Sequence, residues 1–286
     1  MKRLCAVGLV CAALVAQAQE PQQPTFRSAS DAVTVDVSVF DGQRAIPGLT
    51  AADFDVRDNG VRQTVSGVRP NTLPIDVRLL FDTSGSITPE DLERYRRAMT
   101  RVAEALRPED RVEILTFSGR ISEVVPLQHP PITIVTGRQE SDGTSFFDAV
   151  SLAMVTRPVL ERRQITIVLT DAQDNDSFFD KDTLYDSARR TSAVVYGVLP
   201  TGLADDVSRF ATRLEMVARV TGGRLVRSKW DARMGDLLIR TLAEFRQGYV
   251  LNYALAGTPD PGWHKLTVTV PRAKYTIRAR EGYFAR

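Results

Sequence analysis

The sequence contains little cysteine and little histidine, the side chains that supply most sulfur and nitrogen ligands of zinc sites. Its 286 residues include two cysteines, Cys5 and Cys11, and two histidines, His129 and His264. Both cysteines fall in an N-terminal segment that we expect to be removed, so the mature chain should have no thiolate. The histidines lie in a proline-rich stretch and in a β-rich flank, and we expect both to be surface residues. These shortages argue against a thiolate zinc site.

Beyond the N-terminus, the sequence has no hydrophobic run long enough to span a bilayer. A basic start, Met1-Lys2-Arg3, precedes the short apolar stretch 4–16, and Ala18 ends a small-residue cleavage site. This order is typical of a secretory signal peptide. We therefore expect a signal peptide over residues 1–18 with cleavage after Ala18, a flexible segment over residues 19–31, and a secreted or periplasmic mature protein without a membrane span.

The mature sequence also lacks a net charge. The chain has 37 basic and 35 acidic residues, and removal of Lys2 and Arg3 makes the mature protein formally neutral. No stripe of arginine and lysine is interleaved with aromatic residues, as a nucleic-acid surface requires. The cluster of Arg94, Arg96 and Arg97 falls on the polar side of a helical pattern, where solvation explains it. Nucleic acid is therefore not an expected partner.

Residues 75–247 alternate apolar strand runs with helical patterns, which is typical of a parallel sheet wrapped by helices. The expected strands are 76–82, 111–117, 164–170, 193–199 and 224–226, and the expected helices run from Thr88 to before Pro108 and over 145–155, 183–192, 207–220 and 234–247. Residues 123–127 follow the preceding strand too closely for a helical crossover, so we expect them to pair antiparallel at a sheet edge.

The two flanks of this region read as β-strands. Residues 33–39 and 266–270 each alternate with a period of two and have no partner nearby in the sequence. Neither flank has enough strands to bury two faces, whereas about three from each side could build one small sandwich. The sequence therefore predicts a doubly wound α/β domain over residues 75–247, inserted into a β-sandwich built from residues 32–74 and 248–286.

Three loops of the α/β region offer oxygen ligands. They contain Phe81-Asp82-Thr83-Ser84-Gly85-Ser86 after an apolar run, Asp142-Gly143-Thr144-Ser145 at the start of a helical pattern, and Thr170-Asp171 at the end of another apolar run. Hydroxyl and carboxylate oxygens favour hard cations such as Mg²⁺, Mn²⁺ or Ca²⁺ over zinc. Strand carboxyl ends are common ligand sites in such sheets. The candidate metal-binding residues are Asp82, Ser84, Ser86, Thr144 and Asp171.

The order and spacing of these loops resemble the metal-ion-dependent adhesion site of von Willebrand factor A domains. The resemblance implies that Ser84 and Ser86 bind the metal directly and that Thr144 does so when a ligand is present. It implies that Asp82 and Asp171 act mainly through bound waters. The implied cofactor is Mg²⁺, with Mn²⁺ or Ca²⁺ as alternatives, and the implied partner is a protein whose Asp or Glu carboxylate completes the coordination shell.

Further details qualify and extend this resemblance. The family often has Ser-Asp-Gly where this chain has Thr170-Asp171-Ala172, so the loop after Asp171 could follow a different backbone course. Asp174 and Asp176 either frame a second cation site or are simply solvated. Both flanks are similar to those of secreted bacterial VWFA-related proteins, in segments such as Asp58-Asn59-Gly60. In such domains a shift at the metal loops can reach the last helix, here 234–247.

Enzyme families with comparable motifs fit less well. Phosphatases of the haloacid dehalogenase type need a second aspartate two residues after the first, where this chain has Ser84. The chain has no Gly-x-Ser-x-Gly motif of serine hydrolases, and no dinucleotide or P-loop glycine pattern. We therefore expect a binding module without enzymatic activity. The alternative is a structural scaffold of an envelope assembly whose metal site is vestigial.

Overall fold

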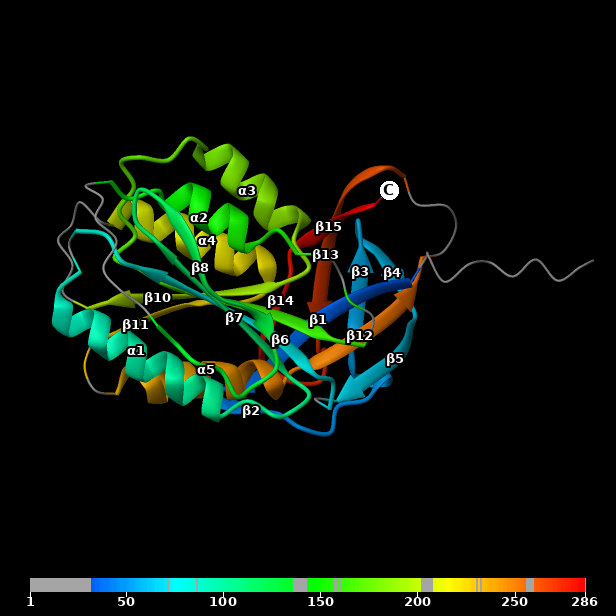
Figure 1. Cartoon of the computed structure of the whole chain (residues 1–286). Helices are drawn as coiled ribbons and strands as arrows, with labels where there is room; N and C mark the ends of the chain where they lie inside the picture. Colours follow the sequence, from blue (N-terminus) through cyan, green and yellow to red (C-terminus); the bar gives the residue numbers. More distant parts are fainter. Residues whose placement is uncertain are drawn as a thin grey trace, which may run out of the picture. The chain divides into compact units, whose positions relative to one another are not determined.

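A six-stranded, mostly parallel sheet forms the centre of the α/β region (Figure 1). Its strands lie in the order β11-β10-β9-β6-β7-β8, and only β8 runs antiparallel to its neighbour, at the edge where the short connection predicts it. The strands are β6 (Ile75–Asp82), β7 (Arg111–Phe117), β8 (Ile121–Gln128), β9 (Arg163–Leu169), β10 (Val194–Pro200) and β11 (Leu225–Ser228). The predicted α/β fold is confirmed.

The computed structural model describes residues 32–70, 72–85, 87–135, 143–156, 159, 161–201, 208–229, 231, 233–255 and 260–285. The expected signal peptide and the segment 19–31 lie outside the described residues, as do two residues of the candidate loops, Ser86 and Asp142.

Helices cover both faces of this sheet (Figure 1). They are α1 (Pro89–Glu104) and α5 (Met234–Arg246) on one face, and α2 (Phe146–Ala153), α3 (Lys181–Arg190) and α4 (Ser208–Thr221) on the other. The start of α1 follows from its sequence, because Thr88 accepts a hydrogen bond from the Asp91 amide (3.2 Å) while the Asp91 carboxylate accepts one from the Thr88 amide. This capping box is the expected N-terminal signal.

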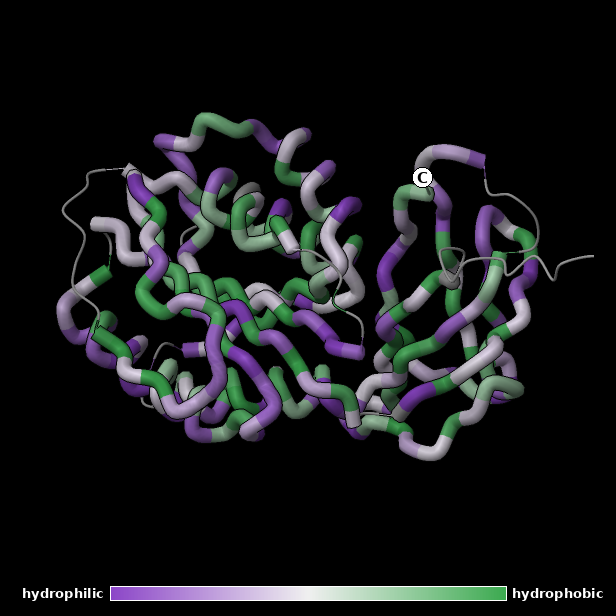
Figure 2. The backbone as a smooth tube through the Cα atoms, turned by 45° about the vertical axis from the view of Figure 1, so that its right-hand side comes forward, coloured by the Kyte–Doolittle hydropathy of each residue, from purple (hydrophilic) through white to green (hydrophobic). Residues whose placement is uncertain are grey.

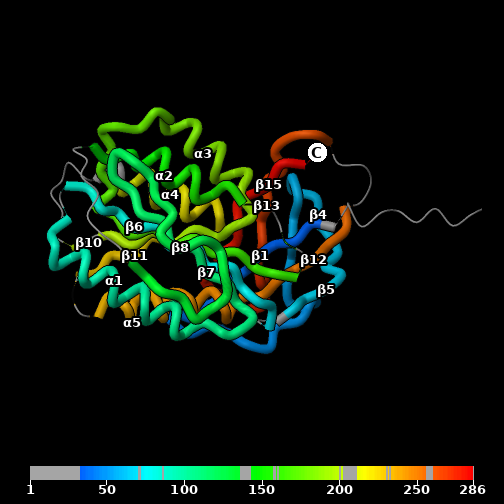
Figure 3. The backbone as a smooth tube through the Cα atoms, in the orientation of Figure 1, coloured from blue at the N-terminus to red at the C-terminus, as the bar shows by residue number. Residues whose placement is uncertain are grey.

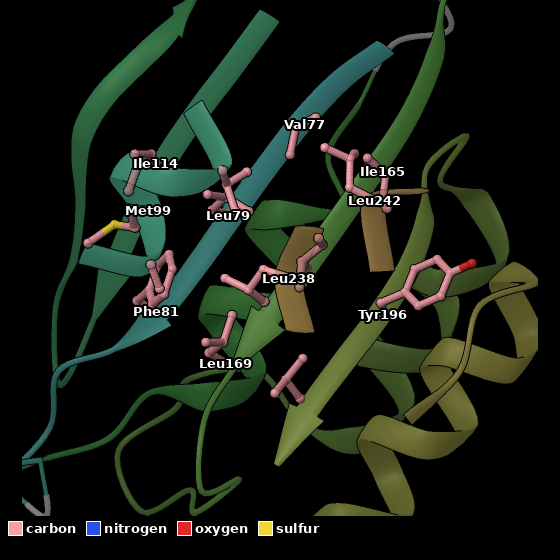
Figure 4. Packing of buried hydrophobic residues seen from close by; sticks show 14 of the residues in the cluster. Val77, Leu79, Phe81, Met99, Ile114, Ile165, Leu169, Tyr196, Leu238 and Leu242 are labelled. Carbon is pink, nitrogen blue, oxygen red and sulfur yellow. The ribbon is translucent and has the colours of Figure 1, made fainter. Parts of the chain in front are cut away.

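The inner strands β6, β7, β9 and β10 are buried on both faces, which explains their continuous apolar runs. Val77, Leu79 and Phe81 of β6 pack toward α1 and α5 (Figure 4), while Leu80 of the same strand packs toward the helices of the opposite face. Figure 2 shows hydrophobic segments along the central strands and hydrophilic ones mostly at the periphery. This double packing anchors the carboxyl ends of β6 and β9, where the candidate metal residues begin.

The two flanks pair with each other in two further sheets, as their alternation predicts (Figure 3). One sheet has the order β14-β1-β12-β5, with β2 beside β1, and the other has the order β15-β13-β3-β4. The N-terminal flank supplies β1 (Ala32–Asp41), β2 (Arg44–Ala45), β3 (Asp55–Asp58), β4 (Val61–Gln63) and β5 (Val65–Pro70), and the C-terminal flank supplies β12 (Tyr249–Ala254), β13 (Gly262–Thr269), β14 (Thr276–Ala279) and β15 (Gly282–Ala285). The expectation of about three strands per flank was too low.

One hydrophobic cluster joins these two sheets. It contains Val35 and Val37 of β1, Leu251 of β12, Val56 of β3 and Leu266 of β13. Two antiparallel contacts connect the flanks directly, β1 with β12 and β3 with β13. The flanks therefore bury their apolar faces together, because neither has the strands to do so alone.

The expectation of two surface histidines was half wrong. His129 is exposed, but His264 is 6% exposed and its Nδ1 lies 2.6 Å from Oδ1 of Asp58. The hydroxyls of Tyr253 and Tyr283 donate to Oδ2 of the same carboxylate, at 3.0 and 2.7 Å. His264 belongs to a buried hydrogen-bonded network because the pairing of β13 with β3 places it beside a buried acid.

Among the described residues, no helix combines the length and the apolar character that crossing a membrane requires.

Candidate metal centre

Asp82 is at the end of β6, where the register of the sheet places it beside the end of β9. Phe81 pairs with Leu169, so Asp82 lies next to Thr170. The Thr170 hydroxyl donates to Oδ2 of Asp82 at 2.6 Å, and the Ser84 amide donates to Oδ1 at 3.0 Å. Two of the three predicted loops therefore meet at the carboxyl edge of the sheet, as expected for adjacent parallel strands.

The Asp82 carboxyl is fully buried, and this changes its acidity. Its pKa is raised from 3.8 to about 6, first by burial and second by the negative charge of Asp171. Hydrogen bonds from Ser84 and Thr170 act in the opposite direction but do not compensate. The shift therefore reports two acidic side chains that share a site with little access to water.

This charge arrangement suits a bound cation. Within the described residues, no cationic side chain pairs with Asp82, and its hydrogen-bond donors, Ser84 and Thr170, are neutral. The field of the two acids extends to Tyr95 on α1, whose pKa is raised by burial first and then by Asp82. A divalent ion at this position would relieve the repulsion and favour the ionised form of Asp82. The donor set of hydroxyls and carboxylates fits a hard cation.

Thr144 lies in the loop that opens α2, and hydrogen bonds fasten this loop to the segment after Asp171. Its amide donates to Oδ1 of Asn175 at 2.7 Å, and its carbonyl accepts from the amides of Asn175 (3.1 Å) and Asp176 (3.3 Å). The neighbouring Ser145 amide donates to the carbonyl of Ser118 at 2.7 Å, which ties the loop to the end of β7. Thr144 is therefore placed at the same edge of the sheet as Asp82 and Asp171.

The structure gives Asp174 a structural role at the start of α2. Its Oδ2 accepts from the amide of Phe147 at 3.0 Å, and its Oδ1 accepts from the amide of Ser177 at 3.2 Å. An acid that satisfies first-turn amides stabilises the positive end of a helix. Across the described part of the chain, no group of three or more histidine, cysteine, aspartate or glutamate side chains is placed to hold a metal ion. This finding applies equally to Asp82 with Asp171 and to Asp174 with Asp176, so it does not distinguish the two candidate sites.

The loop after Asp171 keeps a glycine-like conformation although glycine is absent. Ala172 has φ of +61° and is fully buried, and its amide donates to the Thr170 hydroxyl at 2.8 Å. The left-handed region is unfavourable for residues with a Cβ atom, and such strain is often found at functional sites. The turn is therefore maintained by its surroundings.

Sequence reasoning missed two residues that organise this edge. Thr170 was expected only to end a strand, yet its hydroxyl donates a hydrogen bond to Asp82 and accepts one from the amide of Ala172. Asn175 was not among the predicted site residues, although its side-chain oxygen accepts a hydrogen bond from the amide of Thr144. The alternation of polar residues along the loop after Asp171 was the available signal, because such side chains often bond to nearby backbone groups. Of the five candidate ligands, four are at this edge, and Ser86 lies outside the described residues.

Comparison with known proteins identifies the family of this chain. The chain belongs to the von Willebrand factor type A domain family, whose profile matches residues 76–218. A curated relative, inter-alpha-trypsin inhibitor heavy chain H4 of Bos taurus, is 25% identical over 169 residues, which cover 54% of this chain and 18% of that protein. The chain therefore spans less than a fifth of that relative's length.

Two solved structures resemble the fold. They are the ArnB paralog VWA2 from Sulfolobus acidocaldarius (TM-score 0.51, 10% identity, 89% of this chain and 76% of that chain) and a von Willebrand factor type A protein from Catenulispora acidiphila (TM-score 0.51, 12% identity, 86% and 75%). Domains of this family generally mediate protein–protein interactions, and many use a divalent cation at a metal-ion-dependent adhesion site.

Proposed function

We propose that this chain is a metal-dependent protein-binding module that holds Mg²⁺, with Mn²⁺ or Ca²⁺ as alternatives, and binds an Asp or Glu carboxylate of a partner protein through that ion. The observation that carries the proposal is the buried pair of acids, Asp82 and Asp171, with the Ser84 hydroxyl beside them at the carboxyl edge of the sheet. Because the direct ligands of the ion would be neutral hydroxyls and waters, with both acids acting mainly through waters, the ion keeps positive charge and a coordination position for one incoming anion.

The proposed ligand roles are those that the resemblance to metal-ion-dependent adhesion sites implies. The hydroxyls of Ser84, Ser86 and Thr144 would hold the ion as neutral ligands. The carboxylates of Asp82 and Asp171 would hold it mainly through waters, and the hydrogen bonds to Asp82 support this role because they orient its oxygens. When bound, the ion supplies the positive charge that attracts the partner's carboxylate.

Binding is expected to depend on conformation, because the Thr144 loop cannot move alone. Its hydrogen bonds to Asn175 and Asp176 mean that a shift of Thr144 toward the ion would carry the following loop with it. We include in the proposal that this shift is transmitted to α5, the last helix of the α/β region.

Contacts at the end of α5 support transmission into the β-strand flanks. The amide of Gly248 donates to the carbonyl of Phe245 at 3.2 Å, and a Cβ atom on Gly248 would lie 2.9 Å from the carbonyl oxygen of Val37. The Arg163 guanidinium stacks 4.0 Å above the Phe245 ring, and its Nε lies 2.5 Å from Oδ1 of Asp36. A displacement of α5 would therefore also move β1 and β12.

The proposal includes the place of action and the absence of catalysis. The N-terminal signal-peptide pattern supports a role outside the cytoplasm, in a periplasm or after secretion. Von Willebrand factor type A domains are generally interaction modules without enzymatic activity, and the candidate residues of this chain supply ligands for an ion and no nucleophile paired with a base.

Calorimetry on the purified protein tests the metal site. We expect Mg²⁺ and Mn²⁺ to bind, and we expect Ser84→Ala and Asp171→Ala to weaken binding while the far-UV circular dichroism stays unchanged. If neither ion binds and neither raises the melting temperature, the site is vestigial and the scaffold alternative holds.

A second experiment tests the partner. A pull-down from envelope extract is run in Mg²⁺ and repeated with a chelator, using the wild type and Thr144→Ala. We expect a protein that is retained only in Mg²⁺ and only weakly by Thr144→Ala. Retention that is independent of metal, or equally strong with Thr144→Ala, would show that the partner docks elsewhere.

A further inference from the structure

Phe178 is the most exposed large hydrophobic side chain in the described part of the chain. It is 91% exposed, its neighbour Phe179 is 40% exposed, and their ring centroids lie 5.9 Å apart. Both belong to the loop that begins at the candidate ligand Asp171 and ends at α3. Single exposed apolar residues are common, but a pair of aromatic rings beside a candidate binding site is a feature of contact surfaces.

The backbone under these rings is held in place. The amides of Phe178 and Phe179 donate to the two carboxylate oxygens of Asp148, at 2.9 and 2.7 Å. On the other side, Asp180 caps α3 by accepting from the amide of Thr183 at 2.9 Å. The aromatic pair is therefore presented to solvent by fixed neighbours on both sides, and a surface ordered before binding loses less entropy on association.

Hydrogen bonds make this loop and the Thr144 loop one unit. The Ser177 hydroxyl accepts from the amides of Phe147 and Asp148, at 3.0 and 3.3 Å, and the Ser145 hydroxyl donates to the carbonyl of Asp176 at 3.1 Å. Together with the bonds of Asn175 to Thr144, they connect the aromatic pair to the candidate metal ligands. A polypeptide bound at the ion would meet a surface that includes these rings.

The charges around the aromatic pair restrict the partner. Asp176 is exposed on one side of it, and Asp180 and Asp182 are exposed on the other, with the exposed Lys181, the first residue of α3, between them. The metal ion would attract one carboxylate, whereas the exposed aspartates would repel a strongly acidic segment. Complementary charge therefore favours basic residues next to the single acid.

We propose that the surface formed by the metal site and Phe178 binds an extended segment of a partner protein that carries one acidic residue, an apolar side chain close to it, and basic residues around them. The acid is bound at the ion and the apolar side chain packs on Phe178. The inference rests on the proposed function, since it requires carboxylate binding through the ion, and it adds the chemistry of the neighbouring residues.

Selection of short random peptides on the purified protein tests this inference. Peptides are bound in millimolar Mg²⁺ and eluted with a chelator, and the most enriched sequence is synthesised, with a second version whose apolar residue is alanine. Affinities of both peptides are measured for the wild type, Phe178→Ala, Ser84→Ala and the control Val155→Ala. Val155 is a suitable control because it is 70% exposed and lies after the carboxyl end of α2, outside the proposed surface.

We expect enriched peptides to contain one Asp or Glu near an apolar residue. Phe178→Ala should weaken binding of the first peptide about tenfold, which corresponds to about 1.4 kcal/mol, and binding should still require Mg²⁺. The alanine version should bind the wild type and Phe178→Ala equally, because the two changes remove the same contact. Val155→Ala should leave both affinities unchanged, and Ser84→Ala should abolish both.

Different failures point to different errors. Acidic peptides that need Mg²⁺ but bind Phe178→Ala as well as the wild type would overturn this inference and leave the proposed function intact. A selection without any Mg²⁺-dependent acidic peptide would overturn both. The protein is also tested for flotation with phosphatidylcholine and phosphatidylglycerol vesicles. Flotation that Phe178→Ala abolishes would assign the aromatic pair to a lipid surface and overturn the inference.

Discussion

Replacement of Asp82 by asparagine separates the stability of the metal-free protein from its ability to bind metal. The Asp82 carboxyl is fully buried and its pKa is raised from 3.8 to about 6. Asparagine has nearly the same shape, its oxygen can accept from the Ser84 amide, and the Thr170 hydroxyl can accept from its NH₂ group. The substitution therefore removes a buried charge without removing its hydrogen bonds.

The sign of the effect depends on pH. A raised pKa in the folded state means that the contribution of Asp82 to stability is present below 3.8 and is lost as pH rises through about 6. The difference between these two values corresponds to roughly 3 kcal/mol of unfolding free energy, an upper limit because the surroundings relax. In a chelator at about pH 8, we expect Asp82→Asn to be the more stable protein, with a melting temperature higher by up to about 10 °C.

Metal should reverse this order. At concentrations near 1,000 times the dissociation constant, Mg²⁺ stabilises a protein that binds it by about 4.1 kcal/mol, which exceeds the roughly 3 kcal/mol that the buried charge costs. We expect that gain for the wild type and no gain for Asp82→Asn. At about pH 4 without metal, the two proteins should melt at nearly the same temperature, because Asp82 is then mostly protonated.

Differential scanning fluorimetry across pH, with chelator or Mg²⁺, measures all three quantities. The control is Asp41→Asn, since Asp41 is exposed at the end of β1 and its replacement should change stability by no more than about 0.5 kcal/mol. A lower melting temperature for Asp82→Asn than for the wild type in chelator at about pH 8 would refute the argument that burial of a charge dominates. An equal gain from Mg²⁺ in both proteins would show that Asp82 is not part of a metal site.

Three further predictions concern the surroundings of the site. Ala172→Val should lower the free energy of unfolding by about 2 kcal/mol, because a β-branched residue tolerates φ of +61° poorly. Ala172→Gly should change it by no more than about 1 kcal/mol, since relief of backbone strain offsets the lost methyl burial. Urea unfolding measures both variants, and equal effects would contradict the argument that the backbone of Ala172 is strained. Gly248→Ala should destabilise the protein by about 1–3 kcal/mol, because its Cβ atom would lie too close to the Val37 carbonyl. A crystal structure of the variant should show β1 displaced from the end of α5. An unchanged melting temperature would count against close packing between Gly248 and Val37. The pKa of His264 is raised by its hydrogen bond to the Asp260 carbonyl and by the Asp58 carboxylate. Wild-type stability should therefore include a contribution that is present below pH 6.5 and is lost as pH rises through the folded-state pKa. His264→Gln should remove this contribution, and melting temperatures that change equally with pH in the two proteins would disprove it.

The sequence alone determined the order and type of most elements. Apolar runs predicted the strands of the α/β region, and the single antiparallel edge strand followed from the length of one connection. The Thr88–Asp91 capping box marked the start of α1. The candidate ligands Asp82, Thr144 and Asp171 could also be predicted from the sequence. Each is a polar residue next to a predicted strand or helix, at a position that does not contribute to the hydrophobic core. Periodicity and caps are local properties, so a single sequence contains them.

Tertiary structure decided which of these side chains lose their contact with water and with which partners. Asp82 meets Thr170 across 88 positions of the sequence, and His264 meets Asp58 across 206. Alternation predicted that the flanks need each other, but the pairing of β1 with β12 and of β3 with β13 depends on which apolar faces fit together. The backbone of the exposed Phe178 is likewise bound by Asp148, which precedes it by 30 positions in the sequence. Burial and acidity are set by residues that approach only after the chain has folded, because desolvation and charge interactions depend on distance in space.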